Sequence, residues 1–355
     1  MDTKVLEWNQ LEEAATLLKR GEVVCFPTET VYGMGALCSK QECFDKLVTI
    51  KRRPPEKPFT LMCANFTQAM EYAELDVRVL SVMHAFMPGE ITVLVKPRKN
   101  IPSWMTLGSP YIGIRIPNSP EVLDLIDRVG VPLLVPSANV SGEKTSVSFE
   151  ETLTAFNGSV AAVIRGECHS CLASTIVLFG EQGLKLVRQG PISFEAIEKA
   201  YASASFSVSL GSDHGGFGLK NSIRKHLEER GFHVLDEGTD SLESCDYPFF
   251  AYKAAEDVRT GKANLGILCC TSGEGVMMVA NKVKGIRCGL GYDDVVTGKC
   301  REHNNANMIS FGAAYMEEED VLRRVDIFLA EKFSPLEKHH RRVKEICSLE
   351  QQHSL

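Results

Sequence analysis

The chain has 355 residues, of which 44% are hydrophobic and 24% are charged, and its formal net charge is −7. These values exclude a wholly disordered or collagen-like chain. The length exceeds the ~100–150 residues of a typical domain and predicts two domains. No apolar stretch approaches the ~20 residues that a membrane span needs, and the first residues are too acidic and polar for a signal peptide. We therefore expect a cytoplasmic protein without membrane contact.

The distribution of charge and of cysteines bears on two further functions, nucleic-acid binding and metal binding. Residues 1–200 hold 20 basic and 23 acidic residues, so this part carries −3 and the remainder carries −4. Neither half has the bulk charge of a nucleic-acid-binding module. The twelve cysteines are scattered, and the single tight pair, Cys168 and Cys171, lacks the second pair of a structural zinc site. We expect reduced thiols and no metal site built from side chains, although the sequence leaves open whether this pair binds metal.

Short apolar strands alternate with helices through residues 1–200, and a helical stretch at 191–200 closes this half. The expected strands are Val23–Phe26, Ile91–Val95, Ile112–Ile116, Leu133–Val135 and Thr175–Leu178. Polar residues gather where these strands end. The pattern predicts an α/β domain, residues 1–200, with a twisted and mostly open sheet whose topology does not follow from the pattern.

A short seam of small residues, 199–206, separates this half from a second domain at residues 206–355. There, strands alternate regularly with helices, which predicts parallel βαβ units and a doubly wound, Rossmann-like sheet. The expected strands are Val208–Leu210, His233–Leu235, Leu265–Cys270, Ile286–Leu290 and Asn307–Phe311. The expected helices are Leu219–Arg230, Tyr252–Arg259, Val276–Val283, Asp294–His303 and Glu317–Lys332, with another from Glu337.

Four segments of the first half carry cations or hydroxyls beside strand ends or Pro/Gly turns. They are Pro27–Gly33, Lys51–Lys57, Gly113–Pro117 and Pro136–Gly142. Lys and Arg supply charge, and Ser, Thr and Asn supply directed hydrogen bonds, so together they predict an anion site. No Walker A sequence is present, so side chains would hold nucleotide phosphates.

These segments resemble the YrdC/TsaC family of L-threonylcarbamoyladenylate synthases. The matches are Thr28–Gly33, Lys51/Arg53, Pro88–Thr92, Arg115/Pro117, Pro136–Gly142, Ser174–Ile176 and Arg188, over roughly residues 8–200. The resemblance implies that L-threonine, bicarbonate and ATP, with Mg²⁺, give threonylcarbamoyl-AMP for t6A37 modification of tRNA. It also implies a downstream tRNA threonylcarbamoyl transferase as partner and a weak contact with tRNA.

The resemblance assigns roles to individual residues. Lys51 and Arg53 would hold bicarbonate or phosphate, with Lys57 helping. The residues that would orient threonine are Thr30, Arg115 and Ser137. The residues that would hold the nucleotide are Asn139, Ser141 and Arg188, and Ser174 would line the site. Because every reactant is anionic, electrostatic clamping and positioning should dominate catalysis.

In the second half, Cys270 is followed by a glycine-containing loop that opens a helix. A thiol at such a position favours the thiolate form, and the loop N–H groups can stabilise an enediolate oxyanion. Cys270 is therefore a candidate proton-abstracting base, whereas its neighbour Cys269 is expected to be a buried structural thiol.

This half, roughly residues 206–346, resembles the RpiB/LacAB family of sugar-phosphate isomerases, and ribose-5-phosphate isomerase B above all. The resemblance rests on Ser212–Gly215, Asp246–Pro248, Gly266–Cys270, Ala280–Lys282 and Arg301–Asn307. It implies that Cys270 moves a proton between C1 and C2 and that His303 opens the sugar ring. The sugar-phosphate contacts would be Asp213, His214, Tyr247, Gly273, Gly275, Asn304, Lys338 and Arg342. It implies no cofactor and a homodimer through this half, with sites shared between subunits.

The loop after Cys270 departs from the family pattern, because Thr271 replaces a glycine and Glu274 adds an acid. A glycine with positive φ could not be replaced without strain, and a carboxylate would oppose an enediolate. The leading interpretation is a bifunctional enzyme that also interconverts ribose 5-phosphate and ribulose 5-phosphate. The alternatives are a synthase whose second half binds a sugar phosphate or oligomerises, an isomerase of another aldose phosphate, and an RNA-binding first half.

Overall fold

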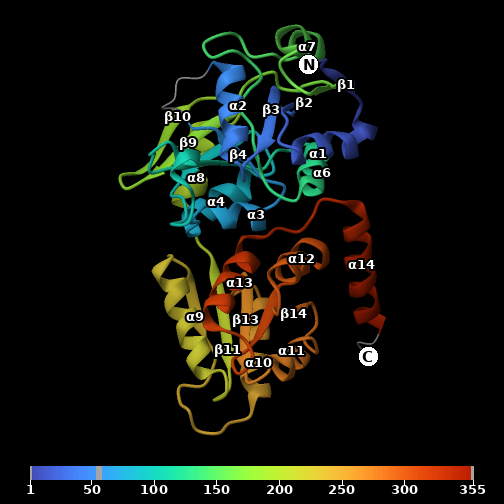
Figure 1. The fold of residues 1–355 in the computed structure, drawn as a ribbon. Coiled ribbons are helices and arrows are strands. Elements are labelled where there is room, and N and C mark those ends of the chain that lie inside the picture. The colour runs from blue at the N-terminus through green and yellow to red at the C-terminus, as the bar shows by residue number, and fades with distance from the viewer. Residues whose placement is uncertain (1, 53–57, 353–355) are drawn as a thin grey trace. The chain divides into compact units, whose positions relative to one another are not determined.

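The computed structural model describes residues 2–52 and 58–352. The chain divides into two compact units, an N-terminal unit (Met1–Leu75 and Val79–Ser203) and a C-terminal unit (Asp76–Arg78 and Ala204–Leu355). Both are α/β, and Figure 1 colours them from blue through green and from yellow through red. The expected pairing of a twisted sheet domain with a doubly wound parallel-sheet domain is confirmed.

The N-terminal unit is built on a ten-stranded mixed sheet with the order β1-β8-β2-β3-β7-β4-β6-β5-β9-β10. Its strands are β1 (Lys4–Leu6), β2 (Val24–Pro27), β3 (Tyr32–Leu37), β4 (Thr60–Met62), β5 (Ile91–Val95), β6 (Ile112–Arg115), β7 (Leu133–Leu134), β8 (Ala162–Ile164), β9 (Thr175–Gly180) and β10 (Gly183–Arg188). The strands from β2 to β8 are almost wholly buried, so they read as continuous apolar runs rather than alternating ones.

Helices cover this sheet. They are the short 3₁₀ turn η1 (Trp8–Gln10), α1 (Leu11–Lys19), α2 (Gln41–Lys51), α3 (Phe66–Tyr72), α4 (Val77–Phe86), α5 (Ser103–Thr106), α6 (Pro120–Val129), α7 (Phe149–Phe156) and α8 (Phe194–Ala202). Helix α6 shows why such segments fold locally. Pro120 starts it, Gly130 ends it in the left-handed region, and its buried stripe includes Val122, Leu125 and Ile126.

The C-terminal unit has a five-stranded sheet, all parallel, with the order β12-β11-β13-β15-β14. The strands are β11 (Ser207–Ser212), β12 (His233–Asp236), β13 (Leu265–Cys270), β14 (Cys288–Leu290) and β15 (Met308–Gly312). The helices are α9 (Phe217–Glu229), α10 (Tyr247–Arg259), α11 (Glu274–Ala280), α12 (Asp294–Asn304), α13 (Glu318–Ala330) and α14 (Glu337–Gln352). In Figure 1, α9 and α11 flank these strands on opposite sides.

The chain reverses direction across this sheet beside its first strand, because β11 is followed by β12 on one side and by β13 on the other. The loops after β11 and β13 therefore separate at a topological switch point, where open α/β sheets bind ligands. Buried residues of α10, α11, β13 and β15 form one apolar cluster in this unit.

Several element boundaries differ from those expected. Helix α10 begins at Tyr247 rather than Tyr252, because Pro248 occupies its first turn, where its missing N–H costs nothing. Helix α8 begins at Phe194 rather than 191, because the Ser193 side chain accepts a hydrogen bond from the Ala196 N–H and caps it there. Within the described part of the chain, no helix is long and apolar enough to cross a membrane.

Candidate active sites

Arg115 is the centre of a buried polar group in the N-terminal unit. It ends β6 and is only 6% exposed. Its Nη2 donates to the Thr30 hydroxyl at 2.9 Å and pairs with Glu29 Oε1 at 2.9 Å. The Thr30 hydroxyl in turn hydrogen-bonds the Thr28 hydroxyl at 2.8 Å. The loop between β2 and β3 is thereby tied to the end of β6, as the candidate roles of Thr30 and Arg115 require.

A second guanidinium lies nearby. Arg188 ends β10, and its Nε and Nη2 donate to the Ser174 carbonyl oxygen at 3.0 and 2.7 Å. The Ser174 hydroxyl shares a 2.9 Å hydrogen bond with the Thr92 hydroxyl of β5. Burial lowers the pKa of Arg188, and the positive charge of Arg115 lowers it further. These two cations therefore raise the local potential together, which suits an anionic ligand.

The register of the sheet explains this convergence. Thr92 pairs with Ile176, and Ile176 also pairs with Arg188, so these positions form one row across three strands. The register of β10 shifts between Leu186 and Arg188, and such an irregularity changes the direction of the side chains that follow it. Arg115 follows Ile114, which pairs with Val93 of the adjacent strand, and so lies at the same end of the sheet.

Lys51 forms a third set of polar contacts in the N-terminal unit. It ends α2, is 2% exposed, and its Nζ donates to the Ser137 carbonyl at 2.6 Å. The same Nζ donates to the carbonyl and the side-chain oxygen of Asn139 at 2.9 and 2.7 Å. The Ser141 N–H donates to the Lys51 carbonyl at 2.8 Å, and this main-chain contact joins the end of α2 to the loop after β7. The structure places the Lys51 ammonium among the oxygens of that loop, and its role in holding bicarbonate or phosphate stays a prediction.

Two other candidates of this unit, Arg53 and Lys57, lie outside the described residues. Among the residues that are described, no group of three or more His, Cys, Asp or Glu side chains is arranged to hold a metal ion. All twelve cysteines, Cys168 and Cys171 included, are free thiols.

The sugar-phosphate candidates of the C-terminal unit fall into two clusters. The first, here called the carboxyl-edge cluster, contains Asp213, His214, Tyr247, Cys270, Gly273 and Gly275. Asp213 and His214 follow β11, and Cys270 ends β13, so this cluster lies at the topological switch point. His214 Nδ1 accepts the Cys245 N–H at 3.1 Å, which leaves its Nε2 as the protonated nitrogen of a neutral ring.

Cys270 is the candidate proton-abstracting base within this cluster. It is 5% exposed, and its Sγ accepts a hydrogen bond from the Gly273 N–H at 3.1 Å. The preceding residue, Cys269, is also buried, and that burial raises the pKa of its thiol well above the ordinary value. Only Cys270 therefore combines a buried sulfur with a donor from the glycine loop.

The glycine loop is tightly fitted. Gly273 has φ +82°, and a Cβ there would lie 2.8 Å from Leu290 and 2.9 Å from the main chain of Phe311. A Cβ on Gly275 would lie 2.8 Å from the Tyr247 ring, so that ring packs over the loop. Thr271 is not among the residues with positive φ, so the strain that sequence reasoning attached to this substitution is absent at this described position.

The second cluster, the amino-edge cluster, contains His303, Asn304, Lys338 and Arg342, together with His339. His303 and Asn304 close α12, just before β15 begins, and the other three belong to α14. The rings of His303 and His339 stack with centroids 4.1 Å apart. Burial lowers the pKa of His303, and Lys338 and Arg342 lower it further.

The two clusters lie at opposite edges of one parallel sheet. Cys270 is level with Gly312, the last residue of β15, whereas His303 precedes Met308, the first. The strand alone separates them by roughly 13 Å at ~3.3 Å per residue. A single chain therefore does not bring His303 to Cys270.

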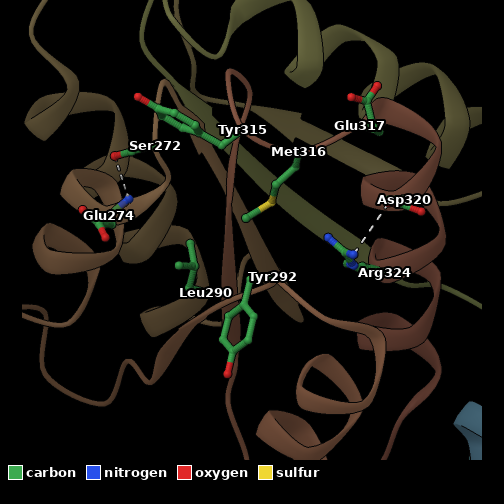
Figure 2. A pocket seen from close by; sticks show the side chains of 9 residues that line it. All are labelled: Ser272, Glu274, Leu290, Tyr292, Tyr315, Met316, Glu317, Asp320 and Arg324. Carbon is green, nitrogen blue, oxygen red and sulfur yellow. Dashed lines mark hydrogen bonds and ion pairs between the residues drawn. The ribbon is translucent and has the colours of Figure 1, made fainter.

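A pocket of about 600 Å³ opens beside the glycine loop, at the carboxyl ends of β13, β14 and β15. Figure 2 shows Ser272 and Glu274 on one side of it, Tyr315 and Met316 above, and Asp320 and Arg324 on α13 opposite. Its lining includes none of the carboxyl-edge cluster. Glu274, whose charge was expected to oppose an enediolate, lines this pocket beside the glycine loop.

Two further polar residues were not among the sequence candidates. Glu29 pairs with Arg115, and His339 stacks on His303. Both lie inside segments that had been singled out, Glu29 in the Pro27–Gly33 turn and His339 in the basic run at 338–342. A lone acid in a hydroxyl-rich turn and a histidine next to the candidate Lys338 were the available signals.

Comparison with known proteins divides the chain in the same way. A family model described as "Telomere recombination" (Sua5_yciO_yrdC) matches residues 16–190. A second model, described as "Ribose/Galactose Isomerase" (LacAB_rpiB), matches residues 208–346.

Individual relatives agree with the family models. The chain is 35% identical over 150 residues to a threonylcarbamoyl-AMP synthase of Pseudoalteromonas translucida, covering 41% of this chain and 80% of that relative. It is 38% identical over 144 residues to ribose-5-phosphate isomerase B of Escherichia coli, covering 41% of this chain and 96% of that relative. The crystal structure of E. coli YciO superposes with a TM-score of 0.52 at 22% identity, covering 55% of this chain and 99% of YciO, and this likeness shows the fold alone.

Proposed function

Because the chain belongs to the Sua5/YciO/YrdC family through its N-terminal part and to the LacAB/RpiB family through its C-terminal part, we propose that it is a bifunctional enzyme. The N-terminal unit would join L-threonine, bicarbonate and ATP into L-threonylcarbamoyladenylate and release pyrophosphate. The C-terminal unit would interconvert ribose 5-phosphate and ribulose 5-phosphate.

The observation that carries the synthase proposal is that the sheet register brings Arg115 and Arg188 to the same end of the sheet, beside Thr92 and Ser174. Glu29 pairs with Arg115, whereas Arg188 is exposed and donates to the neutral oxygens of Ser174, so a ligand anion could bind to the Arg188 charge there. Carbamate and the α-phosphate of ATP are both anionic, and the reaction brings them into contact. Fixed guanidinium donors would stabilise the charge that develops as they react.

The threonine amine would attack carbon dioxide or bicarbonate, and the resulting carbamate would attack the α-phosphate. Thr30, Arg115 and Ser137 would orient the amino acid, and Asn139, Ser141, Ser174 and Arg188 would face the nucleotide. Mg²⁺ would enter as the ATP complex, held by phosphate oxygens.

The proposed synthase reaction would take place in the cytoplasm. Its product, threonylcarbamoyl-AMP, would pass to a tRNA threonylcarbamoyl transferase that modifies position 37 of tRNA. Any direct contact with tRNA would be weak, because a unit of net charge −3 has little nonspecific affinity for a polyanion.

Pyrophosphate release tests this half directly. We expect release that requires threonine and bicarbonate together, and that falls to background when either is omitted. Release that continues without threonine would contradict the proposal and would indicate simple ATP hydrolysis.

The observation that carries the isomerase proposal is the hydrogen bond from the Gly273 N–H to the Cys270 sulfur at the switch point of the sheet. Cys270 would remove the C2 proton of the open-chain aldose and return it to C1, and the loop N–H groups would face the enediolate oxygen. The aldose and the ketose have the same atoms, so no cofactor is needed.

The separation of the two clusters leads us to propose a homodimer through the C-terminal unit. His303, Asn304, Lys338 and Arg342 of one subunit would complete the carboxyl-edge cluster of the other. There His303 would open the sugar ring, and the two cations would bind the phosphate.

An isomerase assay with paired variants tests this half. We expect Cys270→Ala to abolish conversion of ribose 5-phosphate and Cys269→Ala to retain most of it, because only the Cys270 sulfur meets the loop donor. Sugar phosphate should also slow alkylation of Cys270. Wild-type protein that binds ribose 5-phosphate without converting it would instead support a sugar-phosphate-binding module.

A further inference from the structure

Glu29, in the turn between β2 and β3, is held by residues that lie far from it in the chain. Its Oε1 pairs with Arg115 Nη2 and also accepts the Asn118 N–H, both at 2.9 Å. Its main-chain oxygen accepts the N–H groups of His169 and Ser170 at 3.2 and 3.0 Å. The residue is therefore fixed at both its backbone and its side chain.

These contacts constrain Arg115 from one side. Arg115 Nη2 is bound by Glu29 and Thr30 together, whereas its Nε has no hydrogen-bond partner among the described residues. A buried guanidinium nitrogen without a partner is costly, so such a group is commonly retained for a function. The planar fork of arginine binds a carboxylate well only when its plane is held in the correct orientation.

We propose that Glu29 is the positioning residue that orients the Arg115 guanidinium toward the α-carboxylate of the amino-acid substrate. This inference rests on the proposed synthase function. Glu29 touches no reacting atom in this scheme. It acts through Arg115, and so it sets the affinity for the amino acid rather than the rate of adenylate transfer.

Steady-state kinetics of Glu29→Gln test the proposal. The amide can still accept hydrogen bonds but lacks the charge that holds the guanidinium. We expect the KM for threonine to rise roughly 10- to 100-fold, since small misplacements of a binding group have effects of this size. The KM for ATP and kcat should stay close to the wild-type values, and isomerase activity, measured on the same sample, should be unchanged.

A ligand comparison separates positioning from a general structural role. Threoninol has the amine and hydroxyl of threonine but no carboxylate. In competition with threonine it should bind the wild type much more weakly, and Glu29→Gln should remove most of that difference. A merely structural role would weaken both ligands equally and would lower kcat as well, and this result would overturn the proposal.

Two further variants complete the design. Asp257→Asn neutralises another buried carboxylate, which accepts the Ser209 hydroxyl at 3.0 Å in the C-terminal unit, and it should leave the threonine KM unchanged. If Glu29→Gln does not fold, Glu29→Asp keeps the charge but shortens the reach, and it should show the same selective rise. An unchanged threonine KM in a folded, active variant refutes the positioning role alone. Wild-type protein without threonine-dependent pyrophosphate release refutes the proposed function and this inference together.

Discussion

His303 and His339 form a stacked pair, with ring planes only 14° from parallel. Burial lowers the pKa of both rings, and the charges of Lys338 and Arg342 contribute in the same direction. Glu302 opposes this effect on both rings, and Lys299 adds to it for His303. Protonation of both rings would place two like charges in contact, so the stack disfavours the doubly protonated pair.

This pair predicts a loss of stability in mild acid. Because the folded pKa values lie below the unfolded value of about 6.5, the unfolded chain binds more protons. The contribution is complete above about pH 6.5 and is lost as the pH falls through the folded values. Urea midpoints measured from pH 8 to pH 5 should fall, and they should fall less steeply in His339→Gln. Equal slopes for the two proteins would contradict the assignment.

Lys51→Met should destabilise the N-terminal unit. The substitution leaves the oxygens of Ser137 and Asn139 without their charged donor, which should cost about 1.5–3 kcal/mol. We expect loss of pyrophosphate release with isomerase activity retained. Lys4→Met, which removes an exposed ion pair with Glu13, is the control and should cost no more than about 1 kcal/mol. Similar unfolding midpoints for the two variants would show that the Lys51 contacts add little.

Gly273→Ala should abolish isomerase activity for two reasons that a control can separate. The left-handed backbone costs about 1–2 kcal/mol for an L-residue, and the new Cβ would press on the main chain of Phe311. Gly261 has φ +76° with nothing within 4 Å of its Cβ position, so Gly261→Ala carries the backbone cost alone. Activity and denaturation midpoints should fall much further for Gly273→Ala. Equal effects would mean that the loop can relax.

Mixing inactive subunits tests the shared site. Cys270→Ala and His303→Ala should each be inactive alone, because each lacks one of the two clusters. If subunits exchange at random, a mixed dimer keeps one intact site, so up to about one site in four should recover. Exchange can be confirmed by mass. Confirmed exchange without recovered activity, or a monomer by light scattering, would place both residues in the site of one chain.

The parts of the candidate sites that follow from local rules were predictable. Polar loops after β11 and β13 were expected to meet because carboxyl ends of parallel strands share an edge, and the structure brings Asp213 and Cys270 to that edge. The ten-strand order of the N-terminal unit was not predictable, because it depends on long-range pairings such as β5 with β9. The row that joins Thr92 to Arg188 therefore could not be seen in the sequence.

The burial and the partners of individual charged side chains could not be predicted from the sequence either. Lys51 reads as part of an exposed basic run, yet it is almost fully buried against the loop after β7. Glu29 reads as a lone acid in a hydroxyl-rich turn, and only the fold shows that it pairs with Arg115. In both cases the partner lies more than 80 residues away in the chain.

The carboxyl-edge and amino-edge clusters lie at opposite ends of the strands of the C-terminal sheet, and this separation affects the ratio of the two proposed activities. Synthesis of both units from one chain fixes their amounts at one to one. On the dimer proposed here, however, dilution would dissociate the isomerase into incomplete halves and leave each synthase site intact. The ratio of the two activities in a cell would then vary with the abundance of the protein, although the ratio of the two domains never changes.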